Sequence, residues 1–215
     1  DKKGKKIKGW KYEKNNNRIN KKLQNFRVGT NDYILAERNN SKTQLLAING
    51  SERVQFEQGV QFNNYPISLD KNGTLYAITS EGKLWRGTLD GNSSQLTLSN
   101  LVANSLFAIY ETVNEKQFIY TNNKSIYILN TDFETINSFE LANKITNIVT
   151  YNKELMLATE NELYLWNTEG VVEGFPISSD GYFNIADIDN NGKQNLINTK
   201  NGFIYNYELA DYFIK

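Results

Sequence analysis

The amino-acid sequence predicts an all-β protein built from repeats. Three observations lead to this prediction: the composition, a regular spacing of turns, and short strand-like runs between them. Hydrophobic residues make up 39% and aromatic residues 13% of the 215 residues, enough for a packed core. The runs are rich in β-branched and aromatic residues, and none shows helical periodicity. No apolar run approaches the roughly 18 residues of a membrane span, so we expect no transmembrane segment.

Turn positions recur at a nearly constant interval. When Gly50, Gly91, Asp132, Gly170 and Asp211 are aligned, the spacings are 41, 41, 38 and 41 residues. Within one period four short runs can be read, most clearly in SLFAIYETV, KQFIYTNN, SIYILNTD and TINSFELA. Such runs, bounded by Asn, Asp, Gly, Glu or Lys, are typical of strands joined by tight turns. Four antiparallel strands in each period of about 41 residues predict the blade of a β-propeller.

We expect residues 1–215 to form one β-propeller, or the C-terminal part of a larger ring, with about five blades. One four-stranded sheet cannot bury both of its faces alone, and stacked blades cover them. Residues 1–12 would be the outer strand of an incomplete blade or of a blade that closes the ring. A β-sandwich without a ring is the alternative, because short strands alone do not distinguish the two. The expected blade bounds are 22–60, 61–100, 104–142, 144–178 and 181–215.

The absence of two residue types limits the possible chemistry. The chain has no Cys and no His, which excludes disulfides, thiolate or histidine zinc sites and Ser-His-Asp catalysis. No glycine-rich phosphate loop or dinucleotide-binding pattern is present, so we expect no nucleotide ligand.

Charge is distributed unevenly along the chain. Residues 1–27 contain eleven Lys or Arg and two acidic residues, for a net charge of +9, and the rest of the chain carries −9. This segment is either a solvated edge in which lysines block sheet-to-sheet association, or a surface that attracts a polyanion. The lysines that would make such a contact are Lys2, Lys3, Lys5, Lys6, Lys8 and Lys11.

The stretch NIADIDNNGKQNLI places oxygen-bearing residues at alternate positions around a glycine. Oxygen ligands spaced in this way converge on a hard cation when the loop curls, and glycine permits the sharp turn. The candidate ligands occupy positions 1, 3, 5, 7 and 9 of a calcium loop: Asp187, Asp189, Asn191, Lys193 through its carbonyl, and Asn195.

At these residues the stretch resembles the calcium loops of FG-GAP repeats, also called integrin-type or VCBS-like propeller repeats. The resemblance implies a structural Ca²⁺ between the first two strands of the fifth blade. Asn191 and Asn195 replace aspartates of the family pattern, so we expect weak affinity, about 10⁻⁴ to 10⁻³ M. The other blades are similar to degenerate repeats of bacterial quinoprotein-type propellers. The alternative is that Asp187 and Asp189 only form Asx turns with their own backbone.

Aromatic and acidic residues suggest further candidates. Trp10, Trp85 and Trp166 are candidates for sugar- or base-stacking platforms, because an exposed aromatic face offers apolar contact. Each lies within a predicted strand, so we expect Trp85 and Trp166, and less clearly Trp10, to fill the space between blades instead. Four glutamates near strand ends are candidates for the carboxylate pair of a glycosidase, although their spacing marks no pair: Glu111, Glu115, Glu160 and Glu162.

Together these patterns favour a non-catalytic binding or scaffold module for a protein or glycan partner, with one structural Ca²⁺. Two alternatives stay open: a carbohydrate-active hydrolase or lyase that uses loop carboxylates, and a polyanion-binding module that uses the basic N-terminal segment. We expect no nucleic-acid partner. Because weak calcium loops function where calcium is millimolar, we expect an extracytoplasmic bacterial protein, in the periplasm or at the cell surface.

Overall fold

The computed structural model confirms the all-β prediction. It describes residues 8–12, 23–37, 43–56, 60–63, 66–111, 116–151, 154–167 and 170–209. These residues form twenty strands, and every pairing between them is antiparallel. Neighbouring strands of each sheet follow one another in chain order, except that β17 pairs with β15. Within the described ranges there is no helix with the length and hydropathy needed to cross a bilayer. The chain divides into two compact units, Asp1–Ser105 and Leu106–Lys215.

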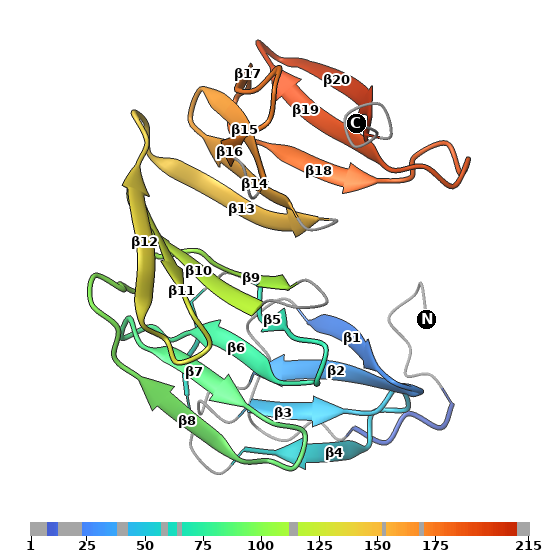
Figure 1. The fold of residues 1–215 in the computed structure, drawn as a ribbon. Coiled ribbons are helices and arrows are strands. Elements are labelled where there is room, and N and C mark those ends of the chain that lie inside the picture. The colour runs from blue at the N-terminus through green and yellow to red at the C-terminus, as the bar shows by residue number, and fades with distance from the viewer. Residues whose placement is uncertain are drawn as a thin grey trace. The chain divides into compact units, whose positions relative to one another are not determined.

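The first unit contains two four-stranded sheets, called here blades one and two (Figure 1). Blade one consists of β1 (Gln24–Val28), β2 (Asn31–Glu37), β3 (Thr43–Leu46) and β4 (Glu52–Gln55). Blade two consists of β5 (Ser68–Leu69), β6 (Leu75–Ile78), β7 (Leu84–Gly87) and β8 (Ser93–Leu96).

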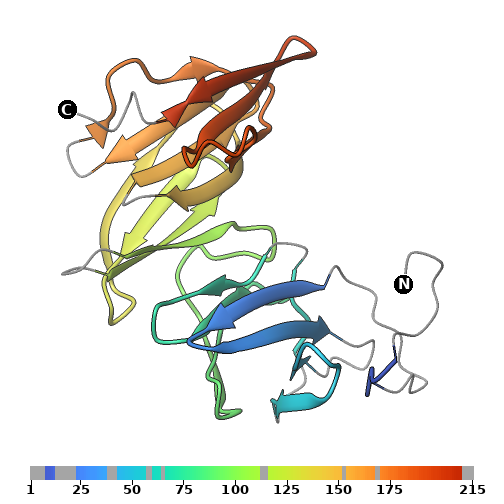
Figure 2. The same cartoon turned by 90° about the vertical axis from the view of Figure 1, so that its right-hand side faces the viewer.

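The second unit contains three sheets, blades three to five. Blade three consists of β9 (Phe107–Glu111), β10 (Lys116–Asn122), β11 (Ser125–Leu129) and β12 (Thr135–Glu140). Blade four consists of β13 (Ile145–Tyr151), β14 (Glu154–Thr159), β15 (Glu162–Asn167) and β16 (Gly170–Val171), and β17 (Ile177–Ser178) also pairs with β15. Blade five consists of β18 (Phe183–Ala186), β19 (Asn195–Lys200) and β20 (Phe203–Glu208), which lie side by side in orange and red in Figure 2.

The turns between the third and fourth strands of blades one, two and three share one geometry. In each, the first residue of the turn donates its backbone N–H to the carbonyl four residues later, at 2.8 to 3.0 Å. The residue before that carbonyl has a positive φ: Gly50 (78°), Gly91 (92°) and Phe133 (63°). The equivalent residue in blade three is therefore Phe133, one position after the Asp132 that the spacing aligned. Glycine takes this conformation without a steric penalty, whereas a bulky side chain does not.

The core of the first unit lies between blades one and two. Tyr33 and Leu45 of blade one pack with Leu75 and Trp85 of blade two in one buried cluster. The side chain of Trp85 is fully buried, as expected for a tryptophan that fills the space between blades.

The second unit has two cores that share the strand β14. Leu155 and Leu157 of β14 pack toward blade three, and Met156 and Ala158 pack toward blade five. Successive side chains of a strand point to opposite faces, so this strand is buried on both. Both faces of β14 contact neighbouring blades, and this explains why the strand has a continuous apolar run, LMLA, in place of alternating apolar and polar residues.

The described part of the N-terminal segment lies against blade one. Lys11 donates its backbone N–H to the carbonyl of Asn49 at 2.8 Å, and the Trp10 ring lies where a side chain at Gly50 would be. Residues 1–7, which contain most of the predicted polyanion-binding lysines, are outside the described residues, as is the predicted turn at Asp211.

Candidate functional site

Two places in the second unit are candidates for function: the loop of blade five and a cavity between blades three and four. The loop connects β18 to β19, and Asp187 follows directly on β18. Asn195 is the first residue of β19, and its side chain is buried. The two strands that flank the loop are those that the sequence predicts.

The loop curls so that its acidic side chains point back toward its own backbone. The two carboxylate oxygens of Asp187 accept the backbone N–H groups of Asn191 (3.1 Å) and Gly192 (2.9 Å). One carboxylate oxygen of Asp189 accepts the same Asn191 N–H (3.3 Å), and the other accepts the Asn191 side-chain amide (2.9 Å). Because both carboxylates share the Asn191 N–H, they lie close together. This arrangement satisfies Asx turns and also gathers the oxygens that a cation would need.

The remaining predicted ligands take other positions. The side-chain oxygen of Asn195 accepts the backbone N–H of Ile188 at 3.4 Å, across the base of the loop. The Lys193 ammonium pairs with the carboxylate of Glu208 on β20. Sequence reasoning missed Glu208, because its proximity depends on the register of β19 and β20, which places Glu208 opposite Asn195.

The side-chain donor atoms of this loop are oxygens, the type of ligand that Ca²⁺ takes in proteins, and in the structure they accept N–H groups of the protein. Within the described ranges, no three or more Asp, Glu, His or Cys side chains are grouped as metal ligands would be. The loop therefore offers two carboxylates, amide oxygens and backbone carbonyls, a donor set that suits Ca²⁺ better than a transition metal.

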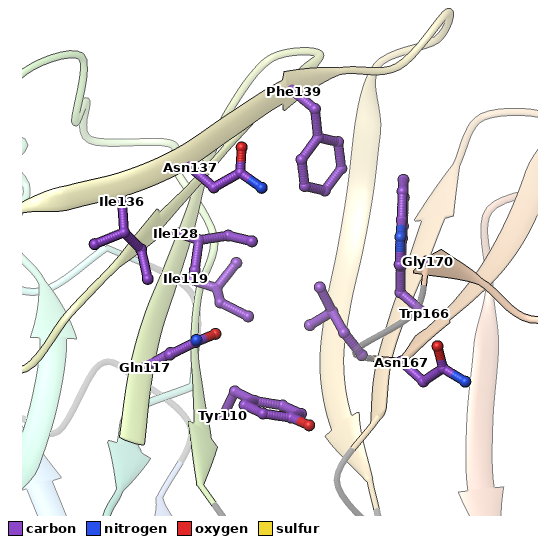
Figure 3. A pocket seen from close by; sticks show the side chains of 11 residues that line it. Tyr110, Gln117, Ile119, Ile128, Ile136, Asn137, Phe139, Trp166, Asn167 and Gly170 are labelled. Carbon is purple, nitrogen blue, oxygen red and sulfur yellow. The ribbon is translucent and has the colours of Figure 1, made fainter. Parts of the chain in front are cut away.

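The second candidate is a cavity of about 740 Å³ between blades three and four (Figure 3). One wall comes from β9 to β12 and the other from β14, β15 and β16. Small-molecule sites occupy roughly 300 to 1,000 Å³, so the cavity has the size of a ligand site. Aliphatic side chains line it from both blades, Ile119 and Ile128 from blade three and Leu155 from blade four, and all three also pack in the core between the two blades.

Three aromatic side chains border this cavity. Trp166 of β15 and Phe139 of β12 approach from opposite blades, with ring centroids 4.5 Å apart and ring planes inclined by 45°. In Figure 3 the Trp166 ring is seen nearly edge-on along one wall, so one of its faces borders the space, and Tyr110 lies at the other end. Trp166 is only partly buried, unlike Trp85, so only Trp85 meets the expectation of complete burial in the core.

Three carboxamides complete the lining: Gln117, Asn137 and Asn167. Asn137 extends from β12 toward the wall formed by Trp166. Its Oδ1 accepts the backbone N–H of Ser138 at 2.8 Å, which orients the amide. None of the eleven lining residues carries a charge. These three positions could not be predicted from the sequence, because Asn and Gln recur throughout the chain and only the packing of two blades brings these residues to one cavity.

Of the four glutamates proposed for a glycosidase pair, the structure describes three: Glu111, Glu160 and Glu162. Tyr164 donates its hydroxyl to the Glu162 carboxylate at 2.6 Å, and burial followed by this hydrogen bond raises the pKa of Tyr164 to about 12. Glu160 lies exposed at the turn between β14 and β15, and Glu111 ends β9. Glu115 lies outside the described residues. None of the three described glutamates lines the cavity.

No family model matches the sequence. No curated protein matches it either. Solved structures are similar in fold. A complex of BBS1N with ARL6DN has a TM-score of 0.64 at 12% identity, covering 86% of this chain and 59% of that one. Virginiamycin B lyase from Staphylococcus aureus has a TM-score of 0.58 at 14% sequence identity, and the match covers 87% of this chain and 74% of the lyase. The Dos1 propeller has a TM-score of 0.55 at 12% sequence identity, and the match covers 82% of this chain and 52% of that one.

These similarities identify the fold. The similar structures are β-propellers, and the chain has the β-propeller fold of repeated four-stranded blades. The chain spans little more than half of the first three similar chains, from 55% to 59% of their length.

Proposed function

We propose that the protein is a non-catalytic binding module of the β-propeller fold, and that the cavity between blades three and four is its ligand site. The observation that carries this proposal is the lining: aromatic and aliphatic walls with three carboxamides and no charged side chain. Ligand sites combine mostly apolar walls with a few polar groups that set orientation. The partner is a protein or a glycan.

The same lining argues against catalysis at this site. General acid–base and nucleophilic mechanisms need a titratable or activated group within reach of the substrate. Neither a carboxylate nor a lysine lines the cavity, and the chain has no histidine or cysteine. One similar structure is a virginiamycin B lyase whose histidine-to-alanine variant is named as catalytically inactive. This chain cannot supply that group.

A cavity-blocking pair of variants tests the proposal. Asn137→Phe places a ring in the cavity from an exposed position of β12, whereas Ser138→Phe places the same ring on the opposite face of that strand. Binding of neutral fragments, such as indoles, cyclic polyols and aliphatic amides, is measured by ligand-observed NMR. We expect Asn137→Phe to abolish binding and Ser138→Phe to retain it. Equal binding by both variants, or no fragment bound by the natural protein, would refute the cavity as the site.

We further propose that the loop of blade five holds one structural Ca²⁺. The close approach of Asp187 and Asp189 on the Asn191 N–H supports this, because two adjacent carboxylates repel each other and a cation between them removes the repulsion. When bound, the ion would cross-link the two ends of the loop. Because a site this weak fills where calcium is millimolar, we place the protein outside the cytoplasm.

Thermal unfolding with and without calcium tests the loop. If Kd is about 10⁻⁴ M, 10 mM calcium stabilises the folded state by about 2.7 kcal/mol. Asp187→Asn should remove this effect. Asp90→Asn is the matched control, because Asp90 also accepts the N–H two residues later in an exposed turn but has no second carboxylate in the loop. An identical melting temperature in calcium and in chelator would refute the calcium site. Asp187 and Asp189 would then serve only to form Asx turns.

A further inference from the structure

We propose that two copies of this chain associate through β20, the last strand of blade five, by antiparallel pairing of the two β20 edges about a twofold axis at Tyr205. This inference does not depend on the proposed ligand site. Three features carry it: a strand edge that no described strand covers, exposed apolar side chains along that edge, and a pattern of side chains and charges that is complementary to itself.

The strand β20 has a neighbouring strand on one side only. β19 pairs with all six of its residues without a register shift, and no other strand of the described residues pairs with it (Figure 1). A sheet edge presents N–H and C=O groups to any further strand, so proteins commonly shorten, charge or distort such edges.

The last strands of the other blades are protected in ways that β20 is not. β4 and β12 both have a register shift against the strand beside them, and the last strand of blade four is divided into β16 and β17. β8 is four residues long, and its exposed residues are Ser94 and Gln95. β20, with the sequence FIYNYE, contains neither Lys nor Pro and has a regular register. Of these last strands, β20 is therefore the one best suited to pair with another chain.

The ladder with β19 determines which backbone groups of β20 face the free edge. Just beyond the strand, Leu209 donates its backbone N–H to the carbonyl of Gln194 at 3.0 Å, so these two residues form a hydrogen-bonded pair. Hydrogen-bonded and non-hydrogen-bonded pairs alternate along an antiparallel ladder. The N–H and C=O groups of Ile204, Asn206 and Glu208 therefore point away from β19, toward the free edge.

The side chains along this edge are apolar and exposed. Phe203, Ile204 and Tyr205 have exposed fractions of 67%, 76% and 39%. Phe203 and Tyr205 share one face of the strand with Tyr207, whose ring stacks on that of Tyr205 with centroids 6.4 Å apart. Exposed apolar residues are ordinary when they are scattered singly, whereas contiguous ones mark an interaction site.

A second copy matches these side chains when the two Tyr205 residues lie opposite each other. Ile204 of each copy then lies opposite Asn206 of the other. Both residues present their backbone groups to the shared edge, so each pair exchanges both of its N–H···O=C bonds. On the aromatic face, Tyr205 packs against its counterpart and Phe203 against Tyr207 of the other copy, and such cross-strand aromatic pairs stabilise a sheet.

The charges along the edge also suit a second copy. Glu208 is the charged residue of β20, and its carboxylate pairs with the Lys193 ammonium. In the register described, Glu208 lies opposite Gly202 of the other copy, at the end of the hairpin that carries Lys200. Charges of opposite sign are thus brought to the same end of the pair, and no like charges lie directly opposite each other.

The exposed area indicates a weak dimer. The side chains of Phe203, Ile204 and Tyr205 together expose on the order of 300 Å² in each copy, since a whole aromatic side chain presents roughly 150 to 250 Å². Two copies would bury about twice that area plus the edge itself, which is less than the roughly 1,200 Å² of a stable interface. We therefore expect a dissociation constant of about 10⁻⁵ to 10⁻³ M.

Cysteine cross-linking tests the register, because the natural chain has no cysteine. Opposite residues of a non-hydrogen-bonded antiparallel pair have Cα atoms about 4.5 Å apart, which a disulfide can span. We expect Tyr205→Cys to form a covalent dimer under mild oxidation about tenfold faster than Tyr182→Cys. Tyr182 is 75% exposed and its carbonyl accepts the N–H of Thr199, on the side of β19 away from β20. Equal rates for the two variants would indicate random collision and refute the pairing.

Sedimentation velocity from about 10 µM to about 1 mM, which brackets the expected dissociation constant, tests the association itself. The average mass of the natural protein should rise toward twice that of the monomer. Ile204→Lys places a charge on the edge and should abolish this rise. Ile48→Lys is the matched control, because Ile48 is 70% exposed in the turn between β3 and β4, and it should retain the rise. A natural protein that stays monomeric, or equal association of both folded variants, would refute the proposal.

Amide hydrogen exchange distinguishes a second copy from other occupants of the edge. In the dimer, protection of the Ile204 and Asn206 N–H groups should increase with protein concentration. Protection that is the same at all concentrations would mean that residues 210–215 of the same chain cover the edge, and this result would overturn the inference.

Discussion

Trp85 and Gly87 offer a sharp test of how blades one and two pack. The Trp85 ring makes edge-to-face contacts with Phe56 (5.0 Å) and Phe62 (4.9 Å), and its exposed fraction is 0%. Gly87, two residues later on β7, lies under the ring. A Cβ added to Gly87 would be 2.2 Å from the indole Cη2 atom, far closer than van der Waals contact. The φ of Gly87 is not positive, so the backbone conformation does not require a glycine at this position. The close approach of the Trp85 ring does.

The magnitudes follow from this geometry. Trp85→Ala should lower the free energy of unfolding by about 3 to 5 kcal/mol, the range for deleting a large buried aromatic. Gly87→Ala should lower it by about 1 to 3 kcal/mol through overpacking. In the double variant the new methyl group enters space that the ring has left, so the clash disappears. We expect a favourable coupling of about 1 to 3 kcal/mol between the two substitutions.

Urea denaturation followed by far-ultraviolet circular dichroism measures the four free energies, since its signal does not depend on the tryptophan removed. A Gly87→Ala variant within about 0.5 kcal/mol of the natural protein would refute the close contact. If the change in unfolding free energy of the double variant equals the sum of the two single changes within about 0.5 kcal/mol, the two substitutions do not share a packing site.

Other predictions concern the pH dependence, a turn and the composition of the fold. Burial raises the pKa of Glu154, whose Oε2 has no hydrogen-bond partner among the described residues. The folded state then binds the proton more tightly than the unfolded chain, so stability falls as pH rises from the unfolded pKa through the folded one. Glu154→Gln should be more stable than the natural protein at pH 7 and equal to it at pH 3, by thermal unfolding at both values. Asp70→Ala should cost about 1 to 3 kcal/mol in urea denaturation, because the buried carboxylate accepts the N–H groups of Asn72 (3.0 Å) and Thr74 (2.8 Å); a cost below about 0.5 kcal/mol would contradict this. Circular dichroism should show under roughly a tenth helix, against about a third in average domains, and a spectrum near that average would contradict the fold.

The repeat was predictable where glycine marks it. Gly50 and Gly91 identify the turns of blades one and two, because their positive φ is a local requirement that the sequence records. In blade three Phe133 adopts the same conformation, and its ring stacks on Phe118 with centroids 4.6 Å apart. Phe118 lies on a neighbouring strand, so no local sequence pattern indicates this contact. The alignment of turn positions therefore selected Asp132, one residue too early.

The two candidate sites also differ in whether they depend on residues close in sequence or on contacts between blades. The alternating Asp187, Asp189 and Asn191 predicted a curled loop between two strands, because a loop of this kind depends on residues close in sequence. The cavity was not predicted. Trp85 and Trp166 occupy similar strand positions, yet one is enclosed by Phe56 and Phe62 and the other borders open space. That difference depends on the side chains of the adjacent blade, which sequence spacing does not specify.

The strand β14 has a consequence for how the second unit unfolds. Its odd-numbered leucines belong to one core and its even-numbered Met156 and Ala158 to the other. Separating blade three or blade five from blade four would expose one whole face of this strand to water. Repeat proteins have the cooperativity of a one-dimensional chain, in which the interface between neighbours couples their melting. A strand common to two interfaces makes that coupling strong, so blades three to five behave as one cooperative element rather than as three small sheets.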